Sequence, residues 1–385
     1  MIQRLGRLLG LLATAGLASC SADQVHYRSL PTPPGSVQSV VATVYLLGDG
    51  GEASPQRDEV LRYLQQDIEA TLSGDDPAPV VVAFLGDNIY EEGASPEPTD
   101  EDVEKLAGQV RALPVHGDAR GVFVPGNHDW AKGAGLEEAR AAVVRQREWV
   151  RQMAGGRDLS LLPGDGCPGP ETEDVGDVHL VFIDSEWLLR APEGECGSAD
   201  DFYARLAEDL RANRNRRVVI LAHHPLVSGG PHGGNVSPFQ RGPLVYYLAV
   251  KSGIIRQDIA SPAYTAMRRG ISEAIEAGGA RPLIHAAGHD HNLQIIRMTG
   301  DDQPRYQIVS GAAARTERTR RVEGTRYATD GFGYVRLDFT AKDVRVVVHA
   351  RAVDGGPVRP VFACTVSRAA RPDECPEAPI ATASP

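Results

Sequence analysis

The 385-residue sequence is poor in cysteine and has no excess of basic residues, and each shortage excludes a class of function. Its five cysteines are too widely spaced for a zinc site built from thiolates, because such sites pair cysteines a few residues apart. Lys and Arg total 40 against 51 Asp and Glu, a formal net charge of −11. Since nucleic-acid binding needs clustered Lys and Arg, we expect no nucleic-acid partner.

The composition is otherwise that of an ordinary globular protein. Apolar residues make up 42% and charged residues 24% of the chain, which excludes disordered, collagen-like and multi-span membrane proteins. At about 150 residues per domain the length allows two domains, although large α/β proteins often form one. We expect one folded domain at residues 37–354, between a Pro-rich tether at 20–36 and a Pro/Ala-rich tail at 355–385.

The first 19 residues are typical of a secretory signal peptide. Arg4 and Arg7 precede a short apolar run, residues 8–17, which is too short to cross a bilayer comfortably. The following Leu17-Ala18-Ser19-Cys20 resembles the cleavage motif of bacterial lipoproteins, in which the cysteine becomes the lipidated first residue. We therefore expect an exported protein, held at the outer membrane or its periplasmic face only by a lipid on Cys20. A plain cleaved signal peptide or a single anchor helix is the alternative.

Four cysteines remain after the predicted signal peptide and Cys20. An even number in an exported chain indicates two disulfides, for which three pairings are possible. We expect the two local pairs, Cys167 with Cys196 and Cys364 with Cys375.

Apolar, β-branched segments alternate with amphipathic ones through most of the domain. Strands are expected at residues 40–47, 80–85, 122–124, 178–183, 218–222 and 283–287. Helices are expected after the Ser54-Pro55 cap and at residues 101–113, 136–153, 199–213 and 263–277. This alternation predicts a largely parallel sheet covered by helices. Three further strands, at 306–310, 334–339 and 344–350, predict an antiparallel addition, and residues 155–176 and 229–262 predict long loops.

Five of the predicted strands run directly into a polar cluster. The clusters are Gly48-Asp49-Gly50-Gly51, Gly86-Asp87-Asn88-Ile89-Tyr90, Gly126-Asn127-His128-Asp129, His223-His224-Pro225 and Gly288-His289-Asp290-His291. Because ligands bind at the carboxyl ends of strands in α/β sheets, we expect the five clusters to meet at one edge. Oxygen and nitrogen donors without thiolate suit Zn, Mn, Fe or Mg, and they are too many for one ion and about enough for two. Each motif alone is more commonly a turn, a loop or a hydrogen-bonded histidine.

The five clusters resemble the motifs of the purple acid phosphatases, within the calcineurin-like metallophosphoesterases. The family pattern of GDxG, GDxxY, GNH(D/E), a His followed by x-Pro, and GHxH occurs here in order, from Asp49 to His291. Tyr90 distinguishes this group from other metallophosphoesterases, and the flanking residues are most similar to the small, tartrate-resistant type. The resemblance implies an α/β fold, a four-layer α/β/β/α sandwich with mixed sheets.

The resemblance also implies a set of ligands for two metal ions. Asp87 would bridge both ions. The other ligands would be Asp49, Tyr90 and His291 for the first ion, and Asn127, His223 and His289 for the second. The family has Fe(III) at the first position, where a tyrosinate gives a purple colour, and Fe(II), Zn(II) or Mn(II) would be the second ion.

The resemblance implies that a metal-bound hydroxide attacks the phosphorus of a small phosphate ester. We expect His128 to act as general acid or to donate to a phosphate oxygen. His232 is a candidate second active-site histidine, and a loop histidine without a catalytic role is the alternative. Asp129 and Asp290 are expected to orient histidines, while the role of His224 stays open. An insertion at residues 235–260 could roof the site and restrict substrate size.

These residues favour a metal-dependent phosphohydrolase that acts on phosphomonoesters at a dinuclear centre. A phosphodiesterase or nucleotide pyrophosphatase on the same centre is the alternative among enzymes. A surface binding lipoprotein with a decayed metal site is the alternative from another class, but decay predicts lost ligands and every ligand position is filled.

Overall fold

The computed structural model describes residues 39–74, 77–115, 119–190, 195–234, 244–351, 356–368 and 375–376. The predicted signal peptide, the tether and Cys20 lie outside the described residues. Among the helices that are described, none is both long and apolar enough to cross a membrane.

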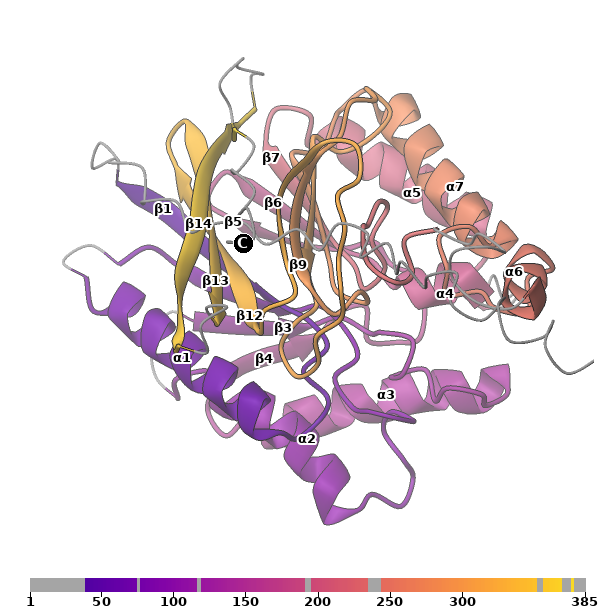
Figure 1. Ribbon diagram of the computed structural model, residues 1–385, viewed down its shortest axis with the longest axis horizontal. Coiled ribbons are helices and arrows are strands. Elements are labelled where there is room, and N and C mark those ends of the chain that lie inside the picture. The colour runs from indigo at the N-terminus through magenta and orange to yellow at the C-terminus, as the bar shows by residue number, and fades with distance from the viewer. Residues whose placement is uncertain are drawn as a thin grey trace, which may run out of the picture.

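Two seven-stranded sheets form the centre of the molecule (Figure 1). The first contains, in spatial order, β14 (Val358–Ser367), β13 (Asp343–Arg351), β12 (Gly333–Thr340), β1 (Val40–Leu47), β2 (Val80–Phe84), β3 (Ala119–Phe123) and β4 (Asp158–Leu161). The second contains β11 (Thr325–Thr329), β9 (Leu293–Arg297), β10 (Tyr306–Ser310), β8 (Ile284–Ala287), β7 (Arg217–Leu221), β6 (Val178–Phe182) and β5 (Glu171–Val175). In the first sheet, neighbouring strands from β1 through β2 and β3 to β4 are parallel. In the second sheet, neighbouring strands from β6 through β7 and β8 to β10 are parallel. The remaining pairs are antiparallel, so both sheets are mixed.

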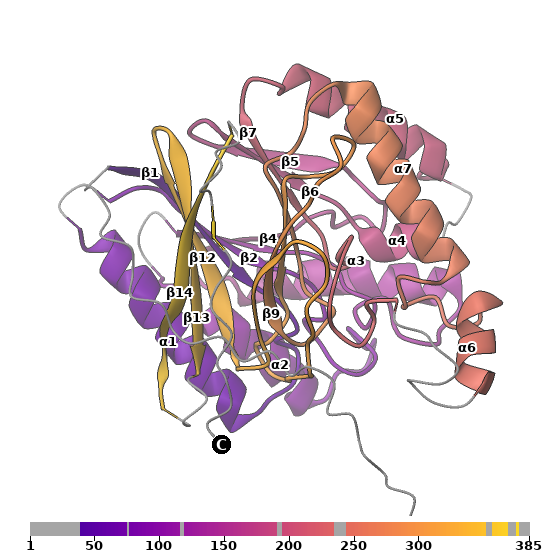
Figure 2. The same ribbon diagram turned by 45° about the horizontal axis from the view of Figure 1, so that its top comes forward.

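Helices cover the outer face of each sheet (Figure 2). The first sheet carries α1 (Pro55–Leu72), α2 (Asp100–Arg111) and α3 (Leu136–Met153). The second carries α4 (Ser185–Arg190), α5 (Ala199–Ala212) and α7 (Pro262–Gly278), with the short α6 (Leu244–Lys251) beyond them. The predicted four-layer α/β/β/α sandwich with mixed sheets is confirmed, whereas the expectation of one largely parallel sheet is wrong because the strands divide between two.

Strand β1 shows why the central strands appear in the sequence as unbroken apolar runs. Ala42, Val44 and Leu46 point into the core between the two sheets, and Tyr45 and Leu47 point into the core under the helices. All five side chains are buried. A strand that is covered on both faces has no polar side, so its sequence does not alternate.

Side-chain caps at the starts of α1 and α2 explain why the sequence predicts where these two helices begin. The Ser54 hydroxyl accepts a hydrogen bond from the Arg57 N–H (3.1 Å), with Pro55 in the first turn of α1. Thr99 and Asp102 form a capping box at the start of α2.

Three predicted loops or tails contain regular structure instead. Residues 155–176 include β4 and β5, residues 229–262 include α6, and the predicted tail at 355–385 begins with β14. Strands β4 and β5 lie at sheet edges and are only partly buried, so they lack the apolar runs of central strands. The Pro and Ala content of the tail concealed β14, in which Pro360 sits at a shift in register with β13.

Both expected disulfides are confirmed. Cys167 pairs with Cys196 across 29 residues, and Cys364 of β14 pairs with Cys375 across 11 residues.

Candidate metal centre

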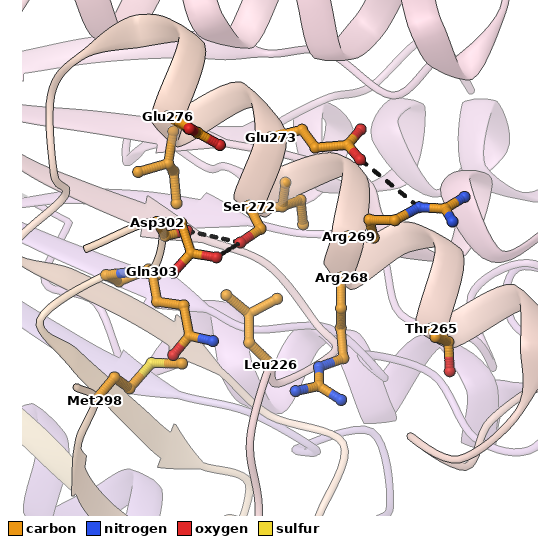
Figure 3. A pocket seen from close by; sticks show the side chains of 13 residues that line it. Leu226, Thr265, Arg268, Arg269, Ser272, Glu273, Glu276, Met298, Asp302 and Gln303 are labelled. Carbon is orange, nitrogen blue, oxygen red and sulfur yellow. Dashed lines mark hydrogen bonds and ion pairs between the residues drawn. The ribbon is translucent and has the colours of Figure 1, made fainter. Parts of the chain in front are cut away.

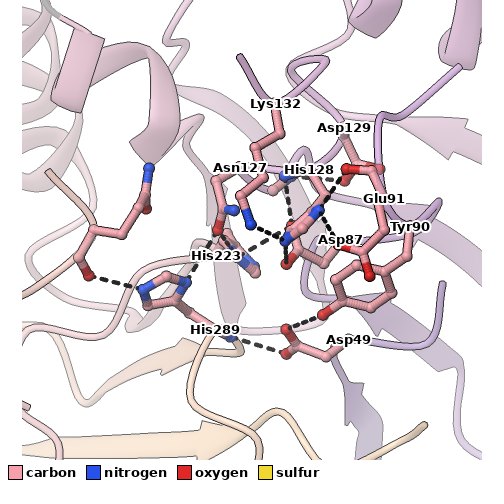
Figure 4. A network of polar contacts seen from close by, with 12 residues as sticks. Asp49, Asp87, Tyr90, Glu91, Asn127, His128, Asp129, Lys132, His223 and His289 are labelled. Atoms are coloured by element: carbon pink, nitrogen blue, oxygen red, sulfur yellow. Dashed lines mark hydrogen bonds and ion pairs between the residues drawn. The ribbon is translucent and has the colours of Figure 1, made fainter. Parts of the chain in front are cut away.

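The five polar clusters meet where the two sheets come together, as the sequence predicts, but they come from both sheets rather than from one edge. Asp49, Asp87 and Asn127 follow β1, β2 and β3 of the first sheet. His223 follows β7, and His289 and His291 follow β8, both in the second sheet. Figure 4 shows Asp49, Asp87, Asn127, His223 and His289 turned toward a common centre.

Three of these residues have left-handed backbone conformations, which non-glycine residues rarely adopt. The φ angles are 60° at Asp49, 53° at Asp87 and 69° at His289. Such strain is characteristic of functional sites, where the surrounding structure holds a side chain in a required direction. Here each strained residue is the first polar side chain after a buried strand.

Glycines let the two sheets approach one another at the centre. A Cβ on Gly288 would lie 2.5 Å from Asp49 Oδ2, and a Cβ on Gly48 would lie 3.0 Å from Gly288 Cα. The close approach allows the His289 N–H to donate to Asp49 Oδ2 (2.8 Å), which joins the sheets directly. Side chains larger than hydrogen at 48 and 288 would separate the ligands of one sheet from those of the other.

One group of donors surrounds the amide oxygen of Asn127. Asn127 Oδ1 lies 3.0 Å from His223 Nε2 and 3.1 Å from His289 Nδ1. Each histidine donates its other N–H to a backbone carbonyl, His223 Nδ1 to Leu85 (2.8 Å) and His289 Nε2 to Gln257 (3.0 Å). Neither His289 Nδ1 nor Asn127 Oδ1 then has a hydrogen to donate, so the two atoms repel each other. A cation bound to both would remove this repulsion.

A second group surrounds the phenol oxygen of Tyr90. Tyr90 Oη donates to Asp49 Oδ1 (3.0 Å) and lies 3.1 Å from His291 Nε2, which is itself 3.4 Å from Asp49 Oδ1. Burial, together with the Asp49 and Asp87 carboxylates, raises the pKa of Tyr90 well above its ordinary value. A cation at this point would favour the phenolate instead.

Asp87 lies between the two groups. One ligand atom each from Asp49, Asp87 and His223 falls within 4.8 Å of the others, and all three residues are buried. Burial opposes a charge on Asp87, but His223, with Oδ1 3.4 Å from its Nε2, holds the pKa of the carboxyl far below its usual range. Asp87 is therefore a carboxylate placed to bridge two cations.

The donor set fits two metal ions of the hard-to-borderline kind. All seven predicted ligands converge, and they offer carboxylate, amide, phenol and imidazole atoms. These are the atoms that Fe, Zn and Mn accept. Asp49, Tyr90 and His291 would hold one ion, Asn127, His223 and His289 the other, and Asp87 both.

His128 lies beside the bridging carboxylate without belonging to either ligand group. Its N–H donates to Asp87 Oδ1 (2.9 Å) and its Nδ1 donates to the Glu91 carbonyl (2.6 Å). Its Nε2 therefore faces the centre, 3.9 Å from Asp87 Oδ2 and 3.4 Å from Lys132 Nζ. Lys132 belongs to no motif, and only the structure brings it to the site (Figure 4).

His232 reaches the opposite side of the centre. Its ring centroid lies 4.5 Å from that of the candidate ligand His289. Its backbone N–H donates to Asp290 Oδ1 (3.0 Å), and its buried Nδ1 has no hydrogen-bond partner among the described residues. The predicted second active-site histidine therefore lies beside a candidate ligand, and nothing in the geometry assigns it a step.

Arg315 is a second residue that the sequence does not place at the site. Its guanidinium lies 4.2 Å above the ring of Tyr90. It forms ion pairs with Glu52 and with Glu91 (2.5 Å). The cation packs Tyr90 against the centre while the two carboxylates compensate its charge. The sequence shows Arg315 only as the start of a short basic stretch.

The aspartates beside the ligands do not act as predicted. Asp129 orients backbone rather than a histidine: its carboxylate accepts the N–H groups of Gly126 (2.7 Å), Asn88 (3.0 Å) and Ile89 (3.2 Å), which fixes two ligand loops. Burial and the nearby Asp87 carboxylate raise the pKa of Asp129 to about 7. Asp290 binds the backbone of His232.

A separate cavity of about 430 Å³ lies between α7 and the turn at residues 298–304 (Figure 3). Leu226, three residues after His223, forms part of its wall, along with Arg268, Ser272 and Asp302. None of the seven candidate ligands lines this cavity, so it is distinct from the candidate metal centre.

Comparisons with known proteins agree with this geometry. Residues 42–249, more than half of the chain, match the family profile described as calcineurin-like phosphoesterase. A structure of GAP50, the anchor in the inner membrane complex of Plasmodium, has a TM-score of 0.54 at 13% identity and covers 87% of this chain and 91% of its own. A structure of PhoD has a TM-score of 0.52 at 13% identity, with coverage of 88% and 70%. At this identity both neighbours show a shared fold.

One curated relative matches over a shorter part of its length. A valine–tRNA ligase of Bradyrhizobium diazoefficiens is 29% identical over 222 residues. The match covers 54% of this chain but only 21% of the ligase, so the chain spans about a fifth of that protein. The family profile carries the assignment, and the two structures agree with its fold. The chain belongs to the calcineurin-like phosphoesterase family, whose members are metal-dependent hydrolases, as the sequence predicts.

Proposed function

We propose that this protein hydrolyses small phosphate monoesters at a dinuclear metal centre of the purple acid phosphatase type. The observation that carries the proposal is the position of Tyr90 Oη, between Asp49 Oδ1 (3.0 Å) and His291 Nε2 (3.1 Å). This buried phenol oxygen contacts two other candidate ligand atoms, so it is placed to bind a metal ion rather than only to pack. Tyr90 is also the residue that distinguishes the purple acid phosphatases from other metallophosphoesterases in the motif pattern.

The proposed ions are Fe(III) beside Tyr90 and Fe(II), Zn(II) or Mn(II) beside Asn127. A phenolate oxygen and two carboxylates suit the harder, more highly charged ion, and the two imidazoles suit a borderline divalent ion. When bound, the ions would lower the pKa of water and neutralise charge at phosphorus.

The chain's own residues then position and protonate the substrate. His128 Nε2 and Lys132 Nζ lie together at the rim and would bind phosphate oxygens. A proton held at His128 Nε2 would pass to the leaving alkoxide, because His128 Nδ1 is fixed by the Glu91 carbonyl and only Nε2 is free to act. His232 would contact the substrate from the side of His289.

We further propose that the protein is exported and attached to a membrane through a lipid on Cys20. The first support is the N-terminal pattern that ends at Cys20. The two disulfides agree with an oxidising compartment, where such bonds persist.

The test is metal analysis, a visible spectrum and hydrolysis assays on the purified protein. The proposal expects about two metal ions per chain, a charge-transfer band that Tyr90→Phe removes, and hydrolysis of p-nitrophenyl phosphate. Activity on bis-p-nitrophenyl phosphate alone would favour the alternative phosphodiesterase or pyrophosphatase. Colourless protein without metal or activity would favour the binding lipoprotein and contradict the proposal.

A further inference from the structure

The segment between α6 and α7 reaches the metal centre through one residue, Gln257. We call residues 252–261 the clasp. The Gln257 carbonyl accepts the Nε2–H of the candidate ligand His289 (3.0 Å). The Gln257 side chain makes two more contacts, from Oε1 to His224 Nε2 (2.7 Å) and from Nε2 to Glu186 Oε2 (2.9 Å).

These contacts fix which atoms carry protons. A Glu186 carboxylate accepts only, and Arg190 already donates to its other oxygen (2.7 Å), so Gln257 must present its NH₂ to Glu186. The Gln257 Oε1 then faces His224, whose Nε2 must carry a proton. His224 Nδ1, left without one, accepts from the Ser185 hydroxyl (2.8 Å).

The proton on the candidate ligand His289 is fixed in the same way. A backbone carbonyl accepts only, so His289 Nε2 carries the proton and Nδ1 presents its lone pair to the second ion's position, 3.1 Å from Asn127 Oδ1. The position of the Gln257 carbonyl therefore decides both the tautomer and the direction of this ligand.

Hydrogen bonds hold the clasp near Gln257. The Ile259 N–H donates to the His232 carbonyl (2.9 Å), and the Ser261 hydroxyl donates to the Arg256 carbonyl (2.8 Å). Ser261 also caps α7. The backbone around Gln257 is thus anchored on one side, and the side-chain contacts with His224 and Glu186 hold Gln257 itself in place.

We infer that Gln257 is a positioning residue for the second metal ion. Contacts with His224 and Glu186 hold Gln257 in place, and its carbonyl orients the candidate ligand His289. The inference rests on the proposed function and deepens it. The sequence predicts for this insertion only a roof that limits substrate size, whereas the contacts give it a role in holding metal.

The test is a calorimetric titration of the chelator-treated protein with Zn(II). Wild type and four variants are compared: Asn127→Ala, Gln257→Ala, Gln257→Glu and, as control, Arg256→Ala. Asn127→Ala identifies the binding step of the second ion by removing it. Gln257→Ala is expected to weaken that step alone by about tenfold to a hundredfold. Arg256 is exposed and lies outside the network of His224 and Glu186, so Arg256→Ala should bind as wild type does.

A charge swap separates positioning from general damage to the fold. Gln257→Glu places a second carboxylate beside Glu186 and removes the donor that Glu186 requires, so it should weaken the second step. Adding Glu186→Gln exchanges the two side chains, so that the amide at position 186 donates to the carboxylate at position 257. The double variant E186Q/Q257E is therefore expected to regain most of the lost affinity, which a residue that only packs would not do.

The outcomes distinguish this inference from the proposed function. Wild type that binds fewer than two ions contradicts both. Wild type that binds two ions, with Gln257→Ala binding both at unchanged affinity, overturns the inference and leaves the proposed function standing. Weakening of both steps equally, without rescue in the double variant, also overturns it, because the effect would then not pass through His289.

Discussion

At the scale of single residues, the site depends on which nitrogen of each histidine is free. His223 uses Nδ1 to bind a carbonyl and presents Nε2, whereas His289 does the reverse. The motifs predict that these histidines are ligands because five polar clusters, each after its own apolar strand, are hard to obtain by chance. They do not predict the partners that orient them, because Leu85 and Gln257 contribute backbone oxygens that any residue would supply.

His128 offers the sharpest test of the proposed chemistry. His128→Ala should lower kcat for p-nitrophenyl phosphate by about a hundredfold or more, because it removes the group that faces the leaving oxygen. Metal content should stay at the wild-type value, since His128 is in neither ligand group. Elemental analysis and steady-state kinetics check this, and full activity in the variant would remove His128 from the mechanism.

Gly126 tests how tightly the bridging carboxylate is enclosed. A Cβ at this position would lie 2.2 Å from the backbone N of Asp87 and 2.3 Å from its Oδ1. Gly126→Ala should therefore displace Asp87 and abolish binding of both ions. Gly133, beside which a Cβ would meet nothing within 4 Å, provides the control as Gly133→Ala, although its φ of 88° adds some strain. Normal metal binding by Gly126→Ala would show that Asp87 does not bridge.

Lys132, Arg315 and Gln257 mark the limit of prediction at this scale. None of them belongs to a spaced motif, so only the folded chain brings them to the centre. A basic stretch at residues 315–326 is visible in the sequence, but nothing there indicates that its first arginine packs on Tyr90.

At the scale of helices and strands, prediction succeeds where an element has its own signal. Helix α3 and strand β1 have the predicted bounds, and helix α1 begins at the predicted cap. Strands β4 and β5 escape prediction because they are short, polar and at sheet edges, where pairing rather than burial defines them. The alternation of strands and helices does not predict the division into two sheets, since the same alternation suits one sheet.

The cap of α1 gives a quantitative test of an element. Ser54→Ala removes the acceptor for the Arg57 N–H and should lower the free energy of unfolding by about 1 kcal/mol. Chemical denaturation of the disulfide-intact protein measures it. Gln56→Ala, at an exposed position two residues away, is the matched control and should change little. Equal stability of the two variants would mean that the cap is not stabilising.

At the scale of the whole molecule, the candidate ligands join two sheets that also meet through buried apolar side chains and through polar contacts such as the ion pair of Arg120 with Glu173. Ions bound between β1–β3 and β7–β8 would link the sheets, and a ligand that binds only the folded state stabilises it by mass action. At a free metal concentration a thousandfold above the dissociation constant, the gain is about 4 kcal/mol. Thermal unfolding with and without chelator should therefore differ by several degrees, and the difference should shrink in Asn127→Ala. Superimposable curves for wild type would contradict bridging of the sheets.

Acid should destabilise the fold through His285 of β8. Burial lowers the pKa of His285 to about 4, against about 6.5 in an unfolded chain. Between these values the unfolded chain binds a proton that the folded chain refuses, so the free energy of unfolding falls as pH falls, by up to about 1.4 kcal/mol per pH unit. Urea unfolding of chelator-treated protein at pH 7 and pH 5 measures this. His285→Leu should reduce the difference, and an unchanged difference would rule out this histidine as the cause.

The distribution of the ligands along the chain has a consequence for maturation. Asp49 and His291 are separated by most of the domain, and the two sheets must both be complete and packed before their donor atoms converge. A growing or partly folded polypeptide cannot capture the pair of ions. If the protein binds the two proposed ions, metallation would follow folding, and the metals available where folding finishes would determine which ions are bound. Preparations from different hosts or growth media should therefore share one structure and differ in their elemental content.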